Sequence, residues 1–192
     1  KQSTPSDQSL KFRLLHETGP GRARLGRLET LHGNLETPTF CPVGTYGAVK
    51  GITPLQLKDT GTDMVLANAY HLMLRPGCET VEKLGGLHAF MGWNGPILTD
   101  SGGYQIFSLG RSLRSGNHDV PLPKHRKVTP ARIRGDSVYF TSHIDGSQIT
   151  LDPEKAIRVQ KRLGADIIMC LDQCAPFPCS STELAESVAR TL

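Results

Sequence analysis

Short apolar segments alternate with capped helical segments along most of this sequence, and that alternation restricts the fold more than any other feature. The apolar runs predict buried strands at 39–45, 63–70, 97–100 and 166–173. Helix start and stop signals predict helices at 53–59, 79–84, 152–163 and 180–192. Strands that alternate with helices favour a parallel sheet with right-handed crossovers. The predicted fold class is therefore α/β.

Two further segments predict antiparallel structure outside this pattern. Short alternating runs separated by glycines over 11–36 predict a small antiparallel β-sheet that precedes the parallel one. The Asp145-Gly146 pair lies between apolar runs at 138–142 and 148–151, which is a strong hairpin signal. Residues 1–9 are polar, and we expect residues 1–10 to form a disordered tail.

The predicted strands end in polar residues or glycine, among them Asn68, Asp100 and Asp172. Both open α/β sheets and TIM barrels gather their chemistry at the carboxyl ends of parallel strands. The sequence contains neither GxGxxG nor GxxxxGK[ST], which disfavours a dinucleotide or P-loop site. Four strands do not close a barrel, which needs eight strands and about 250 residues. We therefore expect 11–192 to be the N-terminal half of a single TIM (β/α)8 barrel domain, truncated at Leu192.

The segment after the third predicted strand combines Asp100, Ser101, Gly102, Gly103 and Tyr104. The glycines allow a tight turn and a close approach of a ligand to the backbone. The carboxylate can accept hydrogen bonds from N–H groups or take a proton, and the tyrosine offers a flat face for stacking. This pattern indicates a site for a flat, nitrogen-rich ring. An ordinary strand-to-turn connection with a capping aspartate is the alternative.

The charge is uneven along the chain. The 192 residues carry a net charge of +4, and 111–135 alone holds seven Lys/Arg and one aspartate, or +6. This basic segment, 111–135, reads as a long loop or irregular hairpin that binds a polyanion such as nucleic-acid phosphate. A solvated insertion explains the same composition.

Composition also restricts the compartment and the metal chemistry. No run of 18 apolar residues exists, so no membrane span is expected. Five cysteines, an odd count without a CxxC pair, make a disulfide framework improbable and suit a reducing cytoplasm. A metal site at Cys170, Cys174 and Cys179 is a weak alternative, because their spacing does not match the usual zinc patterns.

Several long motifs, in the same order, resemble the tRNA-guanine transglycosylase family. The stretches that carry the resemblance are 37–45, 66–77, 86–93, 99–105 and 142–147. The resemblance implies a TIM barrel with a zinc-bearing insertion. It also implies exchange of guanine at the tRNA wobble position for a 7-deazaguanine, on the route to queuosine, through a covalent aspartyl-ribosyl intermediate.

The resemblance also implies residue roles. Asp100 would accept a proton from the incoming base, and Asp172 would accept hydrogen bonds from that base. The base pocket would be lined by Ser101, Gly102, Gly103 and Tyr104. The nucleophilic aspartate and the Cys/Cys/Cys/His zinc ligands would lie beyond Leu192, so no metal ligand is assigned in this chain, and the chain alone is expected to be inactive.

The expected partners are tRNA, guanine and a 7-deazaguanine base, either 7-aminomethyl-7-deazaguanine or queuine. A cytoplasmic homodimer is also implied. Two alternatives belong to other classes of protein. One is a non-catalytic accessory subunit of a transglycosylase, and the other is an RNA-binding module without chemistry that relies on the basic segment.

Overall fold

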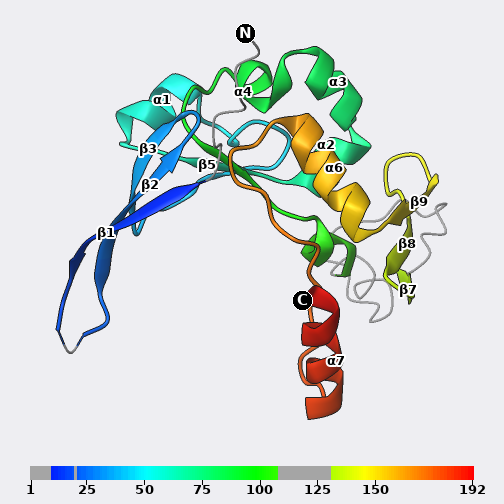
Figure 1. Cartoon of the computed structure of the whole chain (residues 1–192). Coiled ribbons are helices and arrows are strands. Elements are labelled where there is room, and N and C mark those ends of the chain that lie inside the picture. The colour runs from blue at the N-terminus through cyan, green and yellow to red at the C-terminus, as the bar shows by residue number, and fades with distance from the viewer. Residues whose placement is uncertain (1–9, 20, 108–130) are drawn as a thin grey trace, which may run out of the picture.

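A parallel sheet forms the centre of the molecule. The computed structural model describes residues 10–19, 21–107 and 131–192 (Figure 1). Strands β4 (Val43–Gly44), β5 (Val65–Ala67) and β6 (Ile97–Thr99) pair in parallel in that order. A parallel bridge between Leu98 and Ile167 adds a fourth segment beside β6. The α/β class and the parallel pairing are confirmed.

The order of these segments in the sheet follows their order in the chain. A TIM barrel has this order, whereas a doubly wound sheet reverses direction at a switch point. Four segments leave the sheet open at both edges, so the half barrel stays a prediction.

The fourth segment is not the strand predicted over 166–173. Its backbone bonds to β6 only around Ile167, where Thr99 N donates to Ile167 O at 2.9 Å and Ile167 N donates to Ile97 O at 3.1 Å. Two residues further on, the side chain of Gln160 bonds to both backbone polar groups of Met169. Gln160 Nε2 donates to Met169 O, and Gln160 Oε1 accepts from Met169 N, at 2.8 Å each. A buried glutamine thus replaces the sheet ladder, and the segment continues in irregular conformation toward Asp172.

Helices cover the parallel sheet on the side where the chain crosses over. They are α1 (Pro54–Asp59), α2 (Ala69–Leu74), α3 (Cys78–Lys83), α4 (Gly86–Met91) and α6 (Pro153–Leu163). A further helix, α7 (Ser181–Thr191), follows near the C-terminus. The predicted N-caps of α1, α6 and α7 are confirmed: the side chains of Thr53, Asp152 and Ser180 each accept a bond from a backbone N–H in the first turn. In Figure 1, α7 projects away from the rest of the molecule at the C-terminus.

Helix α2 corrects the prediction of a strand over 63–70. The strand ends at Ala67, and α2 begins at Ala69. Asn68 at the N-cap makes no side-chain cap bond, but Asp100 Oδ1, from the next strand, accepts from Ala69 N at 2.7 Å. Because a residue distant in sequence supplies the cap, the local sequence contains no signal that predicts the start of this helix. Helix α4 was also not predicted.

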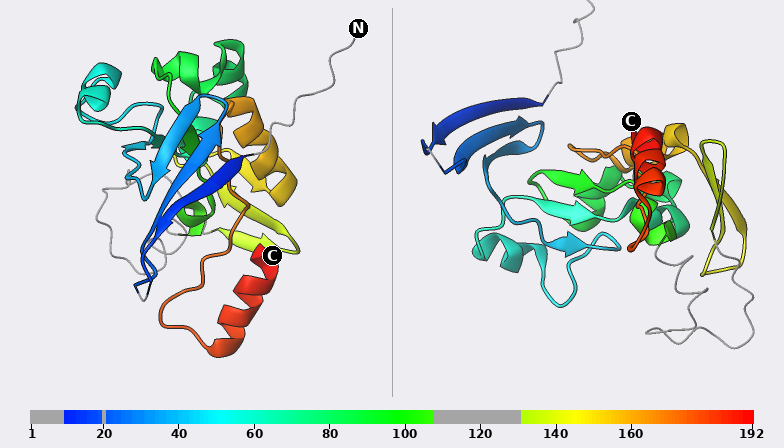
Figure 2. Two further views of the ribbon diagram at one scale, coloured as in Figure 1. Left: turned by 60° about the vertical axis from the view of Figure 1, so that its left-hand side comes forward. Right: turned by 90° about the horizontal axis from the view of Figure 1, so that it is seen from below.

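Two antiparallel sheets flank the parallel one on opposite sides (Figure 2). The first joins β1 (Lys11–Glu17), β2 (Arg24–Thr30) and β3 (Gly33–Thr37), as predicted. The second joins β7 (Arg132–Arg134), β8 (Ser137–Thr141) and β9 (Gln148–Leu151), and it contains the predicted hairpin. Strand β7 forms the end of the basic segment, whereas residues 111–130 lie outside the described part of the chain, as do residues 1–9 of the predicted tail.

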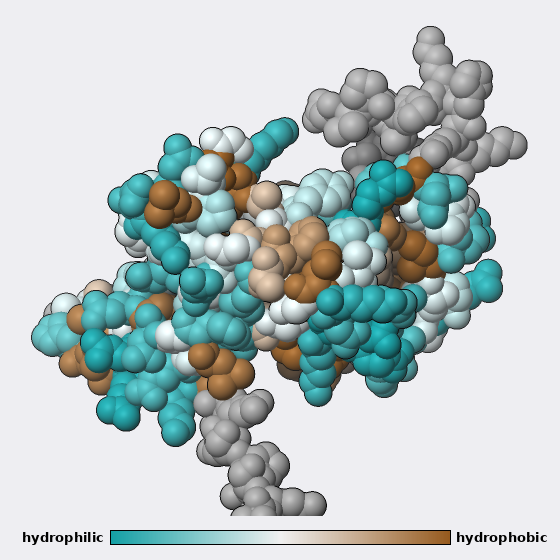
Figure 3. All heavy atoms as spheres, turned by 90° about the horizontal axis from the view of Figure 1, so that it is seen from above, coloured by the Kyte–Doolittle hydropathy of each residue, from teal (hydrophilic) through white to brown (hydrophobic). Residues whose placement is uncertain are grey.

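The apolar core lies between the parallel sheet and helices α1 to α4 and α6. A second cluster fills the space between the hairpin and α2 and α6. Within the described residues, no helix has both the length and the apolar character needed to cross a bilayer. On the face drawn in Figure 3, hydrophobic residues lie in separate patches among hydrophilic ones. Burial in these two clusters holds the carboxyl ends of the parallel strands in place.

Candidate functional site

Asp100 lies directly after β6, where its carboxylate is held by three donors. Asn68 Nδ2 and Gln105 Nε2 donate to Oδ2 at 2.6 and 2.9 Å, and Ala69 N donates to Oδ1 at 2.7 Å. Asn68 follows β5, so the carboxyl ends of two neighbouring strands meet at this carboxylate. The residue is only partly buried. The predicted acceptor therefore sits in a fixed orientation at the expected edge of the sheet.

Asp172 lies in the neighbouring segment and is joined to the Asp100 turn through Ser101. Ser101 Oγ donates to Asp172 Oδ1 at 2.8 Å and accepts from Gly103 N at 3.2 Å. The thiol of Cys174 donates to Asp172 Oδ2 at 3.4 Å. Burial raises the pKa of Cys174 to about 11, with contributions from its hydrogen bond to Asp172 and from the charge of that carboxylate. This thiol therefore stays protonated.

The two glycines are required by their surroundings. A Cβ at Gly103 would lie 2.5 Å from the backbone oxygen of Asp172 and 2.9 Å from its Oδ1. Gly102 has φ +83°, and a Cβ there would lie 3.1 Å from Tyr70 Cβ. Tyr104 follows with 65% of its surface exposed, which leaves its ring face available for stacking. The structure thus brings together Asp100, Ser101, Gly102, Gly103 and Asp172, with Tyr104 at the rim.

Sequence reasoning did not assign the polar and aromatic groups around His71, whose imidazole lies near enough to Asp100 to feel its charge. Tyr70 OH and His143 Nδ1 are 3.1 Å apart, and the rings of Tyr46 and His71 are 4.9 Å apart. Burial and the charge of His143 lower the pKa of His71, and the charge of Asp100 opposes them. Among the described residues, His71 Nδ1 and Gln105 Oε1 are the buried side-chain polar atoms that lack a hydrogen-bond partner. Native structures rarely leave such atoms unsatisfied, and an ordered water molecule is the usual partner in such places.

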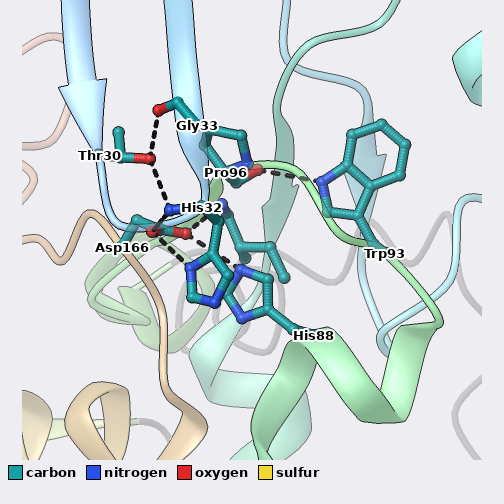
Figure 4. Close-up of polar contacts among 8 residues, drawn as sticks. Thr30, His32, Gly33, His88, Trp93, Pro96 and Asp166 are labelled. Atoms are coloured by element: carbon teal, nitrogen blue, oxygen red, sulfur yellow. Dashed lines mark hydrogen bonds and ion pairs between the residues drawn. The ribbon is translucent and has the colours of Figure 1, made fainter.

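A second cluster of ionisable side chains lies at the other end of the strands. His32, His88 and Asp166 are grouped where β6 begins (Figure 4). It is the one group in the described part of the chain whose ligand atoms lie within metal-binding range, and the three cysteines at 170–179 are not in it. No sequence motif connected these three residues, because they come from three separate segments.

The residue types at the carboxyl-end site suit one kind of chemistry. Two carboxylates with different hydrogen-bond partners, glycines against the backbone and an exposed aromatic ring suit the binding and proton chemistry of a nitrogen heterocycle. The chain is thus an α/β protein that gathers two carboxylates, two glycines and an exposed aromatic ring at the carboxyl ends of parallel strands.

Comparison with known proteins gives the family. A family model described as queuine tRNA-ribosyltransferase, or TGT, matches residues 19–192. Proteins named queuine tRNA-ribosyltransferase from Desulforudis audaxviator and Thermus thermophilus are 49% and 50% identical over 180 and 181 residues, or 94% of this chain. One from Halothermothrix orenii is 47% identical over 184 residues. The chain belongs to the queuine tRNA-ribosyltransferase family, also called the tRNA-guanine transglycosylase family, which confirms the resemblance in the motifs.

The match covers nearly all of this chain but only part of each relative. The matched region is 44% of the Desulforudis and Halothermothrix proteins and 42% of the Thermus protein. The chain therefore spans less than half the length of these curated relatives.

Proposed function

We propose that this chain forms the base-recognition part of a tRNA-guanine transglycosylase, which exchanges guanine at the tRNA wobble position for a 7-deazaguanine. One observation carries the proposal: Asp100 follows β6, Asp172 lies in the irregular segment beside it, and Ser101 connects the two carboxylate-bearing segments. Family membership supplies the reaction, and the site supplies groups that suit it.

The proposed chemistry breaks one N-glycosidic bond and forms another. A nucleophilic aspartate, which the resemblance assigns outside residues 1–192, displaces guanine and forms an ester with the ribose anomeric carbon. The ring nitrogen of the incoming base then attacks that carbon, and the ester bond breaks. Asp100 takes the proton that this nitrogen loses. The bonds from Asn68, Ala69 and Gln105 orient Asp100 for this transfer.

Asp172 would recognise the edge of the base. A guanine-like ring presents N1–H and a 2-amino group side by side, and a carboxylate accepts two such donors. Each Asp172 oxygen has one partner among the described residues, from Ser101 or Cys174, so each retains a lone pair. Tyr104 would stack on the ring.

The resemblance extends the proposal to a zinc ion held outside residues 1–192 and to a homodimer. No residue of this chain is assigned to that zinc ion, and no step above passes through it.

The test is incorporation of labelled guanine into tRNA. The chain is assayed alone and joined to the remaining C-terminal part of the Thermus thermophilus relative. We expect exchange by the joined protein only, and we expect Asp100→Asn to abolish it, because an amide cannot take the proton. Exposed Asp63 provides a matched control, Asp63→Asn, which should exchange normally.

Near-normal turnover by Asp100→Asn would contradict the assignment of Asp100. A joined protein that melts cooperatively and binds tRNA without exchange would favour the accessory subunit or the RNA-binding module instead.

A further inference from the structure

Three side chains from three distant segments meet at the amino end of β6. His32 belongs to the turn between β2 and β3, His88 to α4, and Asp166 to the segment between α6 and Ile167. His32 Nδ1 lies 2.7 Å from Asp166 Oδ1, and His88 Nε2 lies 3.1 Å from Asp166 Oδ2. Figure 4 shows both rings turned toward the one carboxylate.

The donor set and its spacing match those of a transition-metal site. Imidazole nitrogen and carboxylate oxygen are ligands that Zn²⁺ prefers, at about 2.0–2.2 Å. Two donors at that distance on a tetrahedral ion stand about 3.3 Å apart. The observed separations of 2.7 and 3.1 Å are slightly shorter, and the ligand atoms of all three residues lie within 4.8 Å of one another. A small expansion would therefore exchange hydrogen bonds for metal–ligand bonds.

The carboxylate is oriented by the backbone, as metal ligands commonly are. Ile97 N donates to Oδ2 at 2.9 Å, and His32 N donates to Oδ1 at 3.2 Å. The Asp166 side chain is 1% exposed, and burial alone would disfavour its charge. The hydrogen bonds from His88, Ile97 N and His32 outweigh burial and hold the pKa of Asp166 well below its usual range.

The orientation of the two imidazole rings would have to change for both to bind one ion. They stack with centroids 3.5 Å apart and 18° between their planes, so each nitrogen points at its own carboxylate oxygen. Coordination requires one ring to tilt until both lone pairs converge. His32 can make this movement, because it lies on a surface turn with 39% of its side chain exposed. The same exposure leaves a coordination position open to water.

We propose that His32, His88 and Asp166 form a binding site for a divalent transition-metal ion of the zinc class. The proposal does not depend on the base-exchange function, because this site lies at the opposite end of the strands from Asp100. Each ring nitrogen that binds the ion must carry no proton, so a neutral imidazole would keep its proton on its other ring nitrogen. Binding would connect the β2–β3 turn directly to α4 and the parallel sheet.

The test is titration of the chelator-stripped chain with Co²⁺, a spectroscopic substitute for Zn²⁺. We expect one equivalent to bind with visible d–d bands and without a thiolate-to-cobalt charge-transfer band, which separates this site from the five free cysteines. His32→Ala should weaken binding by about tenfold or more, since even outer-shell changes cost metal sites about that much. His16→Ala, on exposed β1, is the matched control and should bind Co²⁺ like the parent.

Thermal melts give a second readout that does not use cobalt absorption. Zn²⁺ should raise the Tm of the parent and of His16→Ala but not that of His32→Ala. His32→Ala should still fold, because its side chain lies on a surface turn. If the parent and His32→Ala bind Co²⁺ equally, or if the bound ion shows the thiolate band, the proposal is wrong. The three side chains then form only a structural hydrogen-bond network.

Discussion

At the scale of single residues, the two aspartates of the carboxyl-end site differ in how much acceptor capacity remains. Asp100 receives three strong donors, whereas Asp172 receives one hydroxyl and one weakly donating thiol. A group that is rigidly held suits transfer of a proton to a fixed position. A group with free lone pairs suits recognition of a ligand's donors. The hydrogen bonds therefore agree with the two roles that the motifs predict.

Asp172→Asn tests the recognition role in the joined protein. The amide keeps the size of the side chain but sets one N–H group against a donor of the base. We expect guanine exchange to fall about 10- to 100-fold, which corresponds to the ~1–3 kcal/mol cost of a buried unsatisfied group. The measurement is kcat/KM for guanine. Asp136→Asn serves as a neighbouring control, and normal exchange by Asp172→Asn would make Asp172 a structural residue.

Gly103→Ala tests the close approach of two backbone segments. The added Cβ would sit 2.5 Å from Asp172 O, so the turn or the Asp172 segment must move. We expect a loss of about 1–3 kcal/mol in the free energy of unfolding, as for other overpacked sites. Urea unfolding measures it. Gly19→Ala meets nothing within 4 Å and should have little effect, so equal stability of both variants would argue against the packing seen here.

At the scale of elements, Gln160 of α6 decides how the fourth segment is attached. Its side chain is fully buried and accepts from Thr99 Oγ1 at 3.1 Å as well as from Met169 N. It thus connects α6, β6 and the segment that leads to Asp172. A polar residue inside a helix interface serves here as a substitute for strand pairing.

Gln160→Leu should detach that segment. The leucine fills a similar volume but leaves the backbone N–H and C=O of Met169 without their partner. We expect a destabilisation of about 1–3 kcal/mol, read as a lower Tm or urea midpoint. Arg158→Leu, on the exposed face of the same helix, should change stability little. A fully stable Gln160→Leu would mean that water or a longer ladder satisfies Met169.

At the scale of the whole molecule, Asp166 connects the first antiparallel sheet to the parallel sheet. His32 lies 134 residues before Asp166 in the chain, and His88 lies 78 residues before it. A single carboxylate thus joins three segments. The ionisation state of Asp166 therefore affects the free energy of unfolding of the whole chain.

Acid should remove this contribution. Folding lowers the pKa of Asp166 below the value of about 4 that the unfolded chain has, so folding gains stability from this carboxylate above about pH 4. That gain is lost as the pH falls from there through the lower folded-state pKa. We expect unfolding free energy measured in chelator to fall across this window in the parent, and to fall less in Asp166→Asn. Asp63→Asn should follow the parent, and an identical pH profile for Asp166→Asn would contradict the prediction.

Much of this architecture could be predicted from the sequence, because its signals are local. The caps at Thr53, Asp152 and Ser180 use partners three residues away. The Asp145-Gly146 turn and the alternation of strands and helices are equally local, and the family motifs are contiguous. Asp100 and Asp172 could be predicted to lie at one edge of the sheet because each follows an apolar run, whereas their roles are implied by the family resemblance.

The sequence by itself determined the class of fold, the helix starts with local caps, and the residues at the carboxyl-end site. Only the tertiary structure decided where α2 begins, how the segment before Asp172 is held, and that His32, His88 and Asp166 meet. The Asp100 cap on Ala69 spans 31 residues, and the longest bond to Asp166 spans 134. Such contacts leave no periodic or local pattern, because their geometry exists only once the strands are side by side.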